Sequence, residues 1–302
     1  MALISTFIPD GPSGFGYSTT AEEITQNIDL KGKTYLVTGS NSGMGNETAR
    51  VLSLRGARVI AAARTVEKAQ AACGDFSSLV MPVACELSEP SSIRACINTI
   101  KQDAPKLDGI ICNAGIMALP KLTKAHGYEL QFFTNHMGHF ILVTGLLDHL
   151  SDAGRVVMLS SAAHKSAFGM DLDNLTGEKG YSSWKSYAQS KLANLLFAKA
   201  LAKRFEGTQQ TANALHPGVI KTNLMRSNLF SEIGMTLINP IFNKTVQEGA
   251  ATQCYVATHP SLAQVNGEYF ADCNLAKHTK YAKDDALAEA LWRVSEDIAA
   301  KV

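Results

Sequence analysis

A tyrosine and a lysine four residues apart are the first pair in this chain that could carry out chemistry. Tyr187 and Lys191 stand in the stretch WKSYAQSKLANLLFAKAL (184–201), whose apolar residues recur at helical spacing. Residues four apart share one face of a helix. A lysine cation beside a phenol favours the phenolate, so the pair could transfer a proton at neutral pH. The alternative is a solvated surface contact. The choice between the two depends on the other motifs of the chain.

A cluster of glycines is suited to binding a phosphate. The stretch TGSNSGMG (38–45) follows an apolar run that predicts a strand, and it precedes a helix-like run. Glycines there let the chain turn sharply and let a pyrophosphate approach free N–H groups at the helix N-terminus. A plain turn is the alternative, but the position between strand and helix favours a dinucleotide site. The expected contacts are Gly39, Ser40, Asn41, Ser42, Gly43, Met44 and Gly45.

The residue that follows the second predicted strand indicates which dinucleotide binds. A carboxylate at that point would accept hydrogen bonds from a ribose 2′-hydroxyl and favour NAD. This sequence has Arg64 there, after three alanines. A guanidinium pairs with a phosphate, which an aspartate would repel. The sequence therefore predicts NADP(H), with NAD(H) the less expected cofactor; the alternative is that Arg64 merely begins a helix in solvent.

The rest of the chain predicts the elements that position these residues. Six apolar strand-like runs alternate with helix-period segments from Lys33 onward, and GEYFAD (267–272) gives a seventh. This pattern predicts an α/β fold with a single Rossmann-type doubly wound sheet of about seven parallel strands, flanked by helices on both faces. Residues 1–30 are expected to form an N-terminal arm and a short helix at about 21–28, and 31–302 a single domain.

An apolar, methionine-bearing segment at about 224–244 interrupts the alternation after the sixth strand. Ligands of open α/β sheets bind beyond the carboxyl ends of the strands. We therefore interpret this insertion as a loop that covers an apolar substrate. The alternative is a pair of surface helices packed on the core.

Four motifs in order along the chain resemble those of the short-chain dehydrogenase/reductase family. They are TGSNSGMG, NAG (113–115), YAQSK (187–191) and PGVIKT (217–222), and the resemblance covers about residues 33–270. The stretches FFTNHMGHFILVTGLL (132–147), SYAQSKLANLLFAKAL (186–201) and GEYFADC (267–273) resemble the retinol-dehydrogenase-like branch. The resemblance implies a Rossmann-fold oxidoreductase that interconverts an alcohol and a carbonyl by hydride transfer.

The resemblance also implies a role for four residues. Tyr187 would be the general acid for reduction and the general base for oxidation. Ser161 would hydrogen-bond the substrate oxygen, with Ser160 as the alternative in that register. Lys191 would hold the nicotinamide ribose, and Asn135 would anchor a water that leads from the lysine to solvent. Further implied cofactor contacts, besides Tyr187 and Lys191, are Glu86, Leu87, Asn113, Ala114, Gly115, Pro217, Gly218, Val219 and Thr222.

Composition restricts the remaining possibilities. The net charge is +1 without a basic stripe, so we expect no nucleic-acid partner. The six cysteines form no Cys-x-x-Cys pair, which is typical of buried thiols in a reducing compartment. No apolar run reaches the ~18 residues of a membrane-spanning helix, so we expect a soluble, cytoplasmic protein.

Two other functions remain open from the sequence alone. The chain could be a nucleotide-binding redox sensor or scaffold with little turnover, or it could reduce a carbon–carbon double bond on the same fold. We expect a small lipophilic carbonyl or alcohol as substrate, and either a monomer or a homodimer. His136 and His139 have no acid or cysteine nearby to complete a zinc site, so no metal is expected. His164 could line the substrate entrance.

Overall fold

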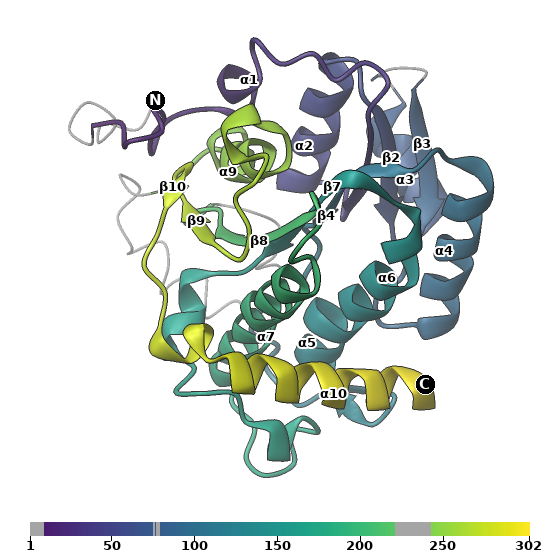
Figure 1. The fold of residues 1–302 in the computed structure, drawn as a ribbon. Coiled ribbons are helices and arrows are strands. Elements are labelled where there is room, and N and C mark those ends of the chain that lie inside the picture. Colours follow the sequence, from purple (N-terminus) through teal and green to yellow (C-terminus); the bar gives the residue numbers. More distant parts are fainter. Residues whose placement is uncertain (1–8, 75, 77–78, 221–242) are drawn as a thin grey trace.

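The computed structural model describes residues 9–74, 76, 79–220 and 243–302. Its centre is an eight-stranded sheet with the spatial order β3-β2-β1-β4-β7-β8-β9-β10. The first seven of these strands are parallel, as the sequence predicts, and β10 is antiparallel to β9 (Figure 1). The strands are β1 (Thr34–Thr38), β2 (Arg58–Ala63), β3 (Val80–Ala84), β4 (Leu107–Cys112), β7 (Leu150–Leu159), β8 (Thr211–His216), β9 (Tyr269–Ala271) and β10 (Asn274–Leu275).

The central strands are buried on both faces because helices cover both. Every residue of β1 and nearly every residue of β2 and β4 is buried, which explains their continuous apolar runs. The strand order reverses between β1 and β4, so the crevice of the doubly wound sheet opens at their carboxyl ends. This is the edge at which the predicted site residues lie.

One face of the sheet is covered by the helices that follow β1, β2 and the loop after β8. These are α2 (Gly43–Leu54), α3 (Val66–Cys73) and α9 (Val246–Thr258), with the short α1 (Ala21–Ile24) packed on α2 and α9 (Figure 1). A capping box of Thr245 and Glu248 begins α9. The core on this side joins α2 and α9 to β1.

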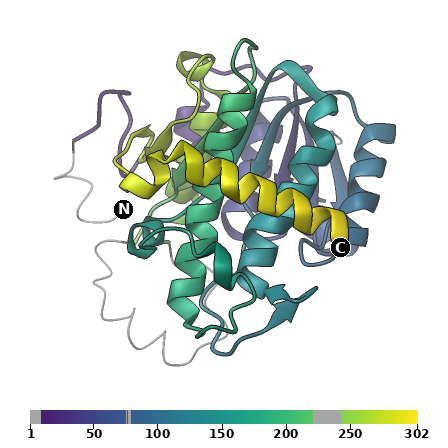
Figure 2. The ribbon, with the colours of Figure 1, turned by 60° about the horizontal axis from the view of Figure 1, so that its bottom comes forward.

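The other face carries α4 (Pro90–Asp103), α5 (Leu130–Phe132), α6 (Gly138–Leu146) and α7 (Ser183–Arg204). The C-terminal helix α10 (Asp285–Lys301) lies across α7 (Figure 2). Trp292 of α10 packs against Phe197 and Phe140, and Arg204 lies 3.6 Å over its ring. The smaller elements are the hairpin β5 (Lys124–Ala125) and β6 (Tyr128–Glu129), the π-helix η2 (Phe133–Met137), and the 3-10 helices η3 (Leu147–His149), η4 (Ala162–Ser166), η5 (Leu172–Asn174), η8 (Pro260–Leu262) and η9 (Lys280–Lys283).

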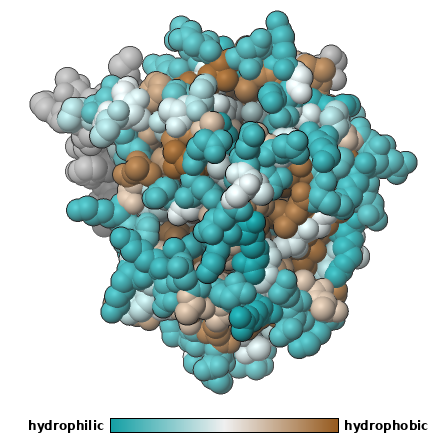
Figure 3. Space-filling model, in the orientation of Figure 1, coloured by the Kyte–Doolittle hydropathy of each residue, from teal (hydrophilic) through white to brown (hydrophobic). Residues whose placement is uncertain are grey.

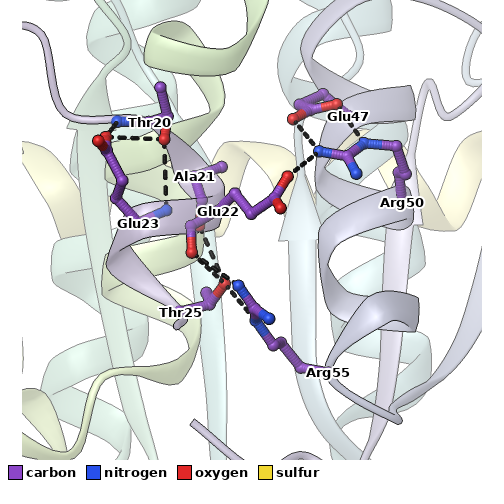
Figure 4. A network of polar contacts seen from close by, with 8 residues as sticks. All are labelled: Thr20, Ala21, Glu22, Glu23, Thr25, Glu47, Arg50 and Arg55. Atoms are coloured by element: carbon purple, nitrogen blue, oxygen red, sulfur yellow. Dashed lines mark hydrogen bonds and ion pairs between the residues drawn. The ribbon is translucent and has the colours of Figure 1, made fainter. Parts of the chain in front are cut away.

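The described part of the N-terminal arm, from residue 9 onward, is anchored to the domain. A capping box of Thr20 and Glu23 begins α1, as the sequence predicts. The helix ends at Ile24, earlier than the expected 28, and the backbone continues in tighter turns, in which Gln26 donates to the Glu23 carbonyl and Ile28 to the Thr25 carbonyl. Arginines of α2 then hold the arm: Arg50 donates to Glu22, and Arg55 donates to the Glu22 carbonyl and to Thr25 (Figure 4).

Polar side chains cover most of the face seen in Figure 3, with apolar patches between them. All six cysteines are free and buried, as expected for structural thiols. Among the residues that the structure describes, no helix is both long and apolar enough to span a bilayer. Of the segment at about 224–244, only residues 243 and 244 lie among the described residues, so the interpretation as a substrate-covering loop stays a prediction.

Candidate active site

The glycine loop between β1 and α2 adopts a conformation that only glycines accept readily. Gly39 and Gly43 have φ values of +71° and +56°. A side chain on Gly45 would overlap the Gly39 carbonyl oxygen, which explains the third glycine. Nothing lies within 4 Å of a Cβ built on Gly43, so the outer side of the loop is open toward a ligand. The Ser40 hydroxyl is buried and donates to the Val37 carbonyl, so its expected cofactor contact stays a prediction.

The carboxyl end of β4 packs directly against this loop. The Asn113 amide donates to the Thr38 carbonyl at 2.9 Å, and the Ala114 N–H donates to the Thr38 hydroxyl at 3.0 Å. The Asn113 side-chain oxygen is buried and has no hydrogen-bond partner among the described residues. A buried acceptor without a partner indicates that a ligand group completes the site. Together with the open glycine loop, it fits a bound dinucleotide.

The residue expected to select the cofactor stands at the end of β2. Arg64 directly follows β2 and is exposed, and no ion pair joins it to a carboxylate within the described parts of the chain. Glu86 follows β3, and its carboxylate accepts both the N–H and the hydroxyl of Ser88. Leu87 is buried beside Gly138, whose Cβ would overlap the Leu87 carbonyl. These three residues surround the region where β2 and β3 end.

The sheet edge also brings together the residues expected to do chemistry. Tyr187 is 7% exposed, and its phenol has a hydrogen bond with the Ser161 hydroxyl. The Lys191 ammonium lies 5.7 Å from the centre of the Tyr187 ring and donates to the Leu159 carbonyl at 3.0 Å. A Cβ on Gly115 would lie 3.5 Å from the Lys191 nitrogen. The end of β4 therefore lies between the glycine loop and the tyrosine–lysine pair.

The neighbouring serines have different partners. Ser160 is buried, and its hydroxyl donates to the Lys191 carbonyl at 2.7 Å, which ties β7 to α7. Ser161 caps the 3-10 helix η4 by accepting from the Ala163 N–H, and its hydroxyl also reaches Tyr187. The geometry favours Ser161 over Ser160 as the hydroxyl that would meet a substrate.

Burial dominates the proton affinities of the tyrosine and the lysine. It raises the pKa of Tyr187 to about 12, and the hydrogen bond from Ser161 opposes this rise. It lowers the pKa of Lys191 to about 8. The Lys191 ammonium is directed at the Leu159 carbonyl. In the protein alone, Tyr187 is therefore protonated at neutral pH. That the lysine cation favours the phenolate stays a prediction.

Asn135 lies in the π-helix η2, where the Gly138 N–H reaches back five residues to the Phe133 carbonyl. Single π turns occur often at functional sites. The Asn135 side chain accepts from the Ile116 N–H at 2.8 Å and donates to the Ile116 carbonyl at 2.9 Å. It also donates to Ser190 at 2.9 Å. Asn135 thus holds the chain beyond β4 against α7.

The loop after β8 contributes at the same edge. Pro217 is buried, Gly218 has a φ of +94°, and Val219 is 42% exposed. Thr222 lies outside the described residues, so its contact stays a prediction. Lys244, which the sequence gives no reason to select, packs on Gly218 and pairs with Asp272 at 2.5 Å.

Two further polar residues support the site and were not predicted from the sequence. The Ser190 hydroxyl accepts from Asn135 and donates to the Tyr187 carbonyl. Asn194 donates to the Leu159 carbonyl at 3.0 Å, beside Lys191. Both lie on the Tyr187 face of α7, three and seven residues further on, so helical periodicity is the signal that could have found them.

His136, His139 and His164 each have different partners. No group of three or more histidine, cysteine, aspartate or glutamate side chains that could hold a metal occurs among the residues placed by the structure. His136 contacts Ser295 of α10, whereas His139 contacts Thr38 of β1. His164 is buried rather than placed at an open entrance, and it contacts the Ser161 carbonyl.

Comparisons with known proteins group this chain with dehydrogenases. The family model described as short chain dehydrogenase matches residues 33–232. The Short-chain dehydrogenase TIC 32 A, chloroplastic, of Brassica napus is 40% identical over 308 aligned positions, which cover 94% of each chain. Retinol dehydrogenase 12 of Mus musculus is 40% identical over 90% of this chain and 87% of its own.

Solved structures share the fold. An uncharacterised protein from Mycobacterium paratuberculosis superposes with a TM-score of 0.76 and 32% identity, over 94% of this chain and 98% of its own. A short chain dehydrogenase from Burkholderia cenocepacia, solved with NADP, has a TM-score of 0.64 over 80% of this chain and 96% of its own. At 23% identity, the second likeness concerns the fold alone.

Proposed function

Because this chain belongs to the short-chain dehydrogenase family, in its retinol-dehydrogenase-like branch, we propose that it is an NADP(H)-dependent oxidoreductase that interconverts an alcohol and a carbonyl. The observation that carries the proposal is the buried Tyr187 phenol, which contacts the Ser161 hydroxyl and lies beside the Lys191 ammonium. This cluster lies across the end of β4 from the glycine loop. A dinucleotide bound there would reach both.

The bound cofactor supplies the hydride that is transferred to or from the substrate carbon. Tyr187 supplies the proton. Its raised pKa keeps the Oη atom protonated at neutral pH, so in the reductive direction it is ready to donate to the developing alkoxide. Ser161 donates a hydrogen bond to the same substrate oxygen and stabilises its charge. Burial of the Tyr187 phenol limits the access of bulk water to the transfer.

Lys191 supports the tyrosine electrostatically. Its ammonium favours the phenolate that remains after the proton has left. Its lowered pKa, about 8, also makes it able to pass on a proton near neutral pH. Asn135 keeps the chain near Gly115 in place against α7, and with it the surroundings of the lysine. In the oxidative direction the same groups act in reverse.

The preference for NADP(H) rests on Arg64. It is exposed at the end of β2, and its guanidinium is unpaired by any carboxylate of the described residues. A phosphate on the adenosine ribose would form charge-assisted hydrogen bonds with it. The absence of an acid at this strand end removes the usual acceptor for the free 2′-hydroxyl of NAD(H).

A lipophilic substrate fits an apolar ring exposed next to the tyrosine and two apolar side chains exposed in loops. The Trp184 ring is 48% exposed and stands edge-on to Tyr187, with 6.2 Å between ring centres. Val219 is exposed in the loop after β8, and Phe168 is exposed in the segment between Ser161 and α7. Several relatives carry the name retinol dehydrogenase, which also supports an apolar alcohol or carbonyl.

Nucleotide titration tests the cofactor site. Protein fluorescence should report saturable binding of NADPH, with NADH weaker. Arg64→Asp should weaken NADPH by about tenfold or more, since it replaces an attraction for phosphate by a repulsion. Arg293→Asp makes the same charge change on the far helix α10, where Arg293 is exposed, and should leave both affinities unchanged. If neither nucleotide binds, the oxidoreductase proposal is wrong and a scaffold function gains support.

A further inference from the structure

His139 lies between the end of β1 and the π-helix that carries Asn135. It lies in α6 and is fully buried. Its Nδ1 atom is 2.9 Å from the carbonyl oxygen of Asn135, one turn earlier. Its Nε2 atom is 2.9 Å from the hydroxyl of Thr38, at the end of β1. Both ring nitrogens therefore have partners, and the partners belong to different parts of the site.

These contacts fix which nitrogen carries the proton. A carbonyl oxygen only accepts, so Nδ1 of His139 must be the donor toward Asn135. Nε2 is then an acceptor, and the Thr38 hydroxyl donates to it. The same hydroxyl accepts the Ala114 N–H at 3.0 Å. Burial lowers the pKa of His139 to about 4, so the ring stays neutral, in this tautomer, at neutral pH.

The result is a continuous chain of hydrogen bonds across the sheet edge. It starts at the Ala114 N–H at the end of β4, passes through Thr38 and His139, and reaches the Asn135 carbonyl. From Asn135 the side chain continues to Ser190, whose hydroxyl donates to the Tyr187 carbonyl. The nucleotide side of the site is thus connected to the helix that carries the tyrosine.

The space between Gly115, Asn135 and Lys191 is tightly packed. A Cβ on Gly115 would lie 3.1 Å from the Asn135 side-chain oxygen and 3.5 Å from the Lys191 nitrogen. Lys191 is also close enough to His139 to lower its pKa through charge repulsion. A shift of the Asn135 peptide would therefore change the surroundings of the lysine ammonium. The Nδ1 atom of His139 donates a hydrogen bond to the carbonyl of that peptide.

We propose that His139 is a positioning residue that couples the cofactor-binding strand ends to the proton-transfer groups, through Thr38 on one side and Asn135 on the other. This inference rests on the proposed oxidoreductase function. Its Thr38 contact should matter for nucleotide affinity, because Thr38 holds Ala114 and Asn113 beside the glycine loop. Its Asn135 contact should matter for turnover, because it fixes the peptide next to the lysine.

Three substitutions separate these two contacts. His139→Asn keeps an amide close to the place of Nδ1, so it retains a donor for the Asn135 carbonyl and loses Thr38. His139→Gln places its amide near Nε2, so it retains the Thr38 contact and loses Asn135. His139→Phe keeps the ring shape and loses both. His136→Gln is the comparison variant, because His136 is equally buried nearby and its Nε2 atom contacts Ser295 of α10 rather than Thr38.

The measurements are NADPH affinity by fluorescence, kcat for a carbonyl substrate over a range of pH, and thermal stability. We expect His139→Gln to bind NADPH as the wild type does but to lose about tenfold or more in kcat. Its kcat profile should move by about half a pH unit, because the lysine surroundings change. His139→Asn should recover most of the kcat and bind NADPH more weakly. His136→Gln should lower stability without either effect.

A purely structural histidine would give another pattern. If all three variants lose kcat and NADPH affinity only in proportion to their loss of stability, the coupling proposal is overturned. If the wild type binds NADPH but turns over no carbonyl, the proposed function fails first. The affinity comparison between His139→Asn and His139→Gln would still test the Thr38 half of the inference.

Discussion

Replacing Lys191 by methionine should make the cofactor-free protein more stable at neutral pH, although it removes a residue proposed to act in the reaction. The lysine nitrogen is buried, and its one hydrogen bond to the described residues goes to the Leu159 carbonyl. Methionine would fill similar space without a charge. The Leu159 carbonyl would not lose its last partner, because Asn194 also donates to it at 3.0 Å.

The size of the effect follows from the proton affinity of the lysine. Burial lowers its pKa from 10.5 to about 8. This difference corresponds to a cost of up to about 3 kcal/mol for keeping the ammonium in the folded protein at pH 7. The unfolded chain holds the proton more tightly than the folded one. The cost is therefore fully present below pH 8, and it disappears as the pH rises toward 10.5.

Thermal unfolding of wild type and Lys191→Met at about pH 7, 9 and 10.5 measures this cost. We expect the variant to unfold roughly 5 °C higher at neutral pH, since 1 kcal/mol moves Tm by about 2 °C in a chain of this size. The gap should nearly close at the highest pH. Lys199→Met is the control, because Lys199 lies on the same helix but reaches solvent and pairs with Asp285. A Lys191→Met variant with no higher Tm than the wild type at pH 7 would contradict this explanation. So would a Tm difference that does not change with pH.

Two further substitutions test other parts of the account. Gly45→Ala should abolish NADPH binding in a fluorescence titration, because the added methyl overlaps the Gly39 carbonyl and displaces the phosphate-binding turn; normal affinity would show that the turn tolerates a side chain. Arg50→Leu should lower the free energy of unfolding in urea by about 1–3 kcal/mol, because Glu47 is only 6% exposed and would lose its cationic partner. An unchanged urea midpoint would mean that the Glu47–Arg50 pair contributes nothing net.

The sheet could be predicted because its strands leave a clear pattern. Strands such as β1 and β4 are buried on both faces, so they appear in the sequence as short continuous apolar runs between helical segments. β10 leaves no such pattern, since it has two residues, Asn274 and Leu275, neither of them buried. The end of α1 was also missed, because a helix and the tighter turns that follow it here require similar residues.

The candidate site was predictable where residue type and order carry the information. The glycine loop, Arg64 and the Tyr187–Lys191 pair were each identified from spacing and from the strand or helix beside them. The choice between Ser160 and Ser161 was not, because adjacent serines differ only in which way the strand directs them. The sequence also gives no measure of the burial that raises the pKa of Tyr187.

The destination of the transferred hydride is the most direct test of the proposed carbonyl reduction. Wild type and Tyr187→Phe would each be given NADPH that carries deuterium at the transferable position, with a panel of lipophilic aldehydes, ketones and enones. We expect deuterium on the carbinol carbon of the wild-type product. We also expect no product from Tyr187→Phe, which should bind NADPH normally. Deuterium at a former carbon–carbon double bond, or full turnover by Tyr187→Phe, would contradict it.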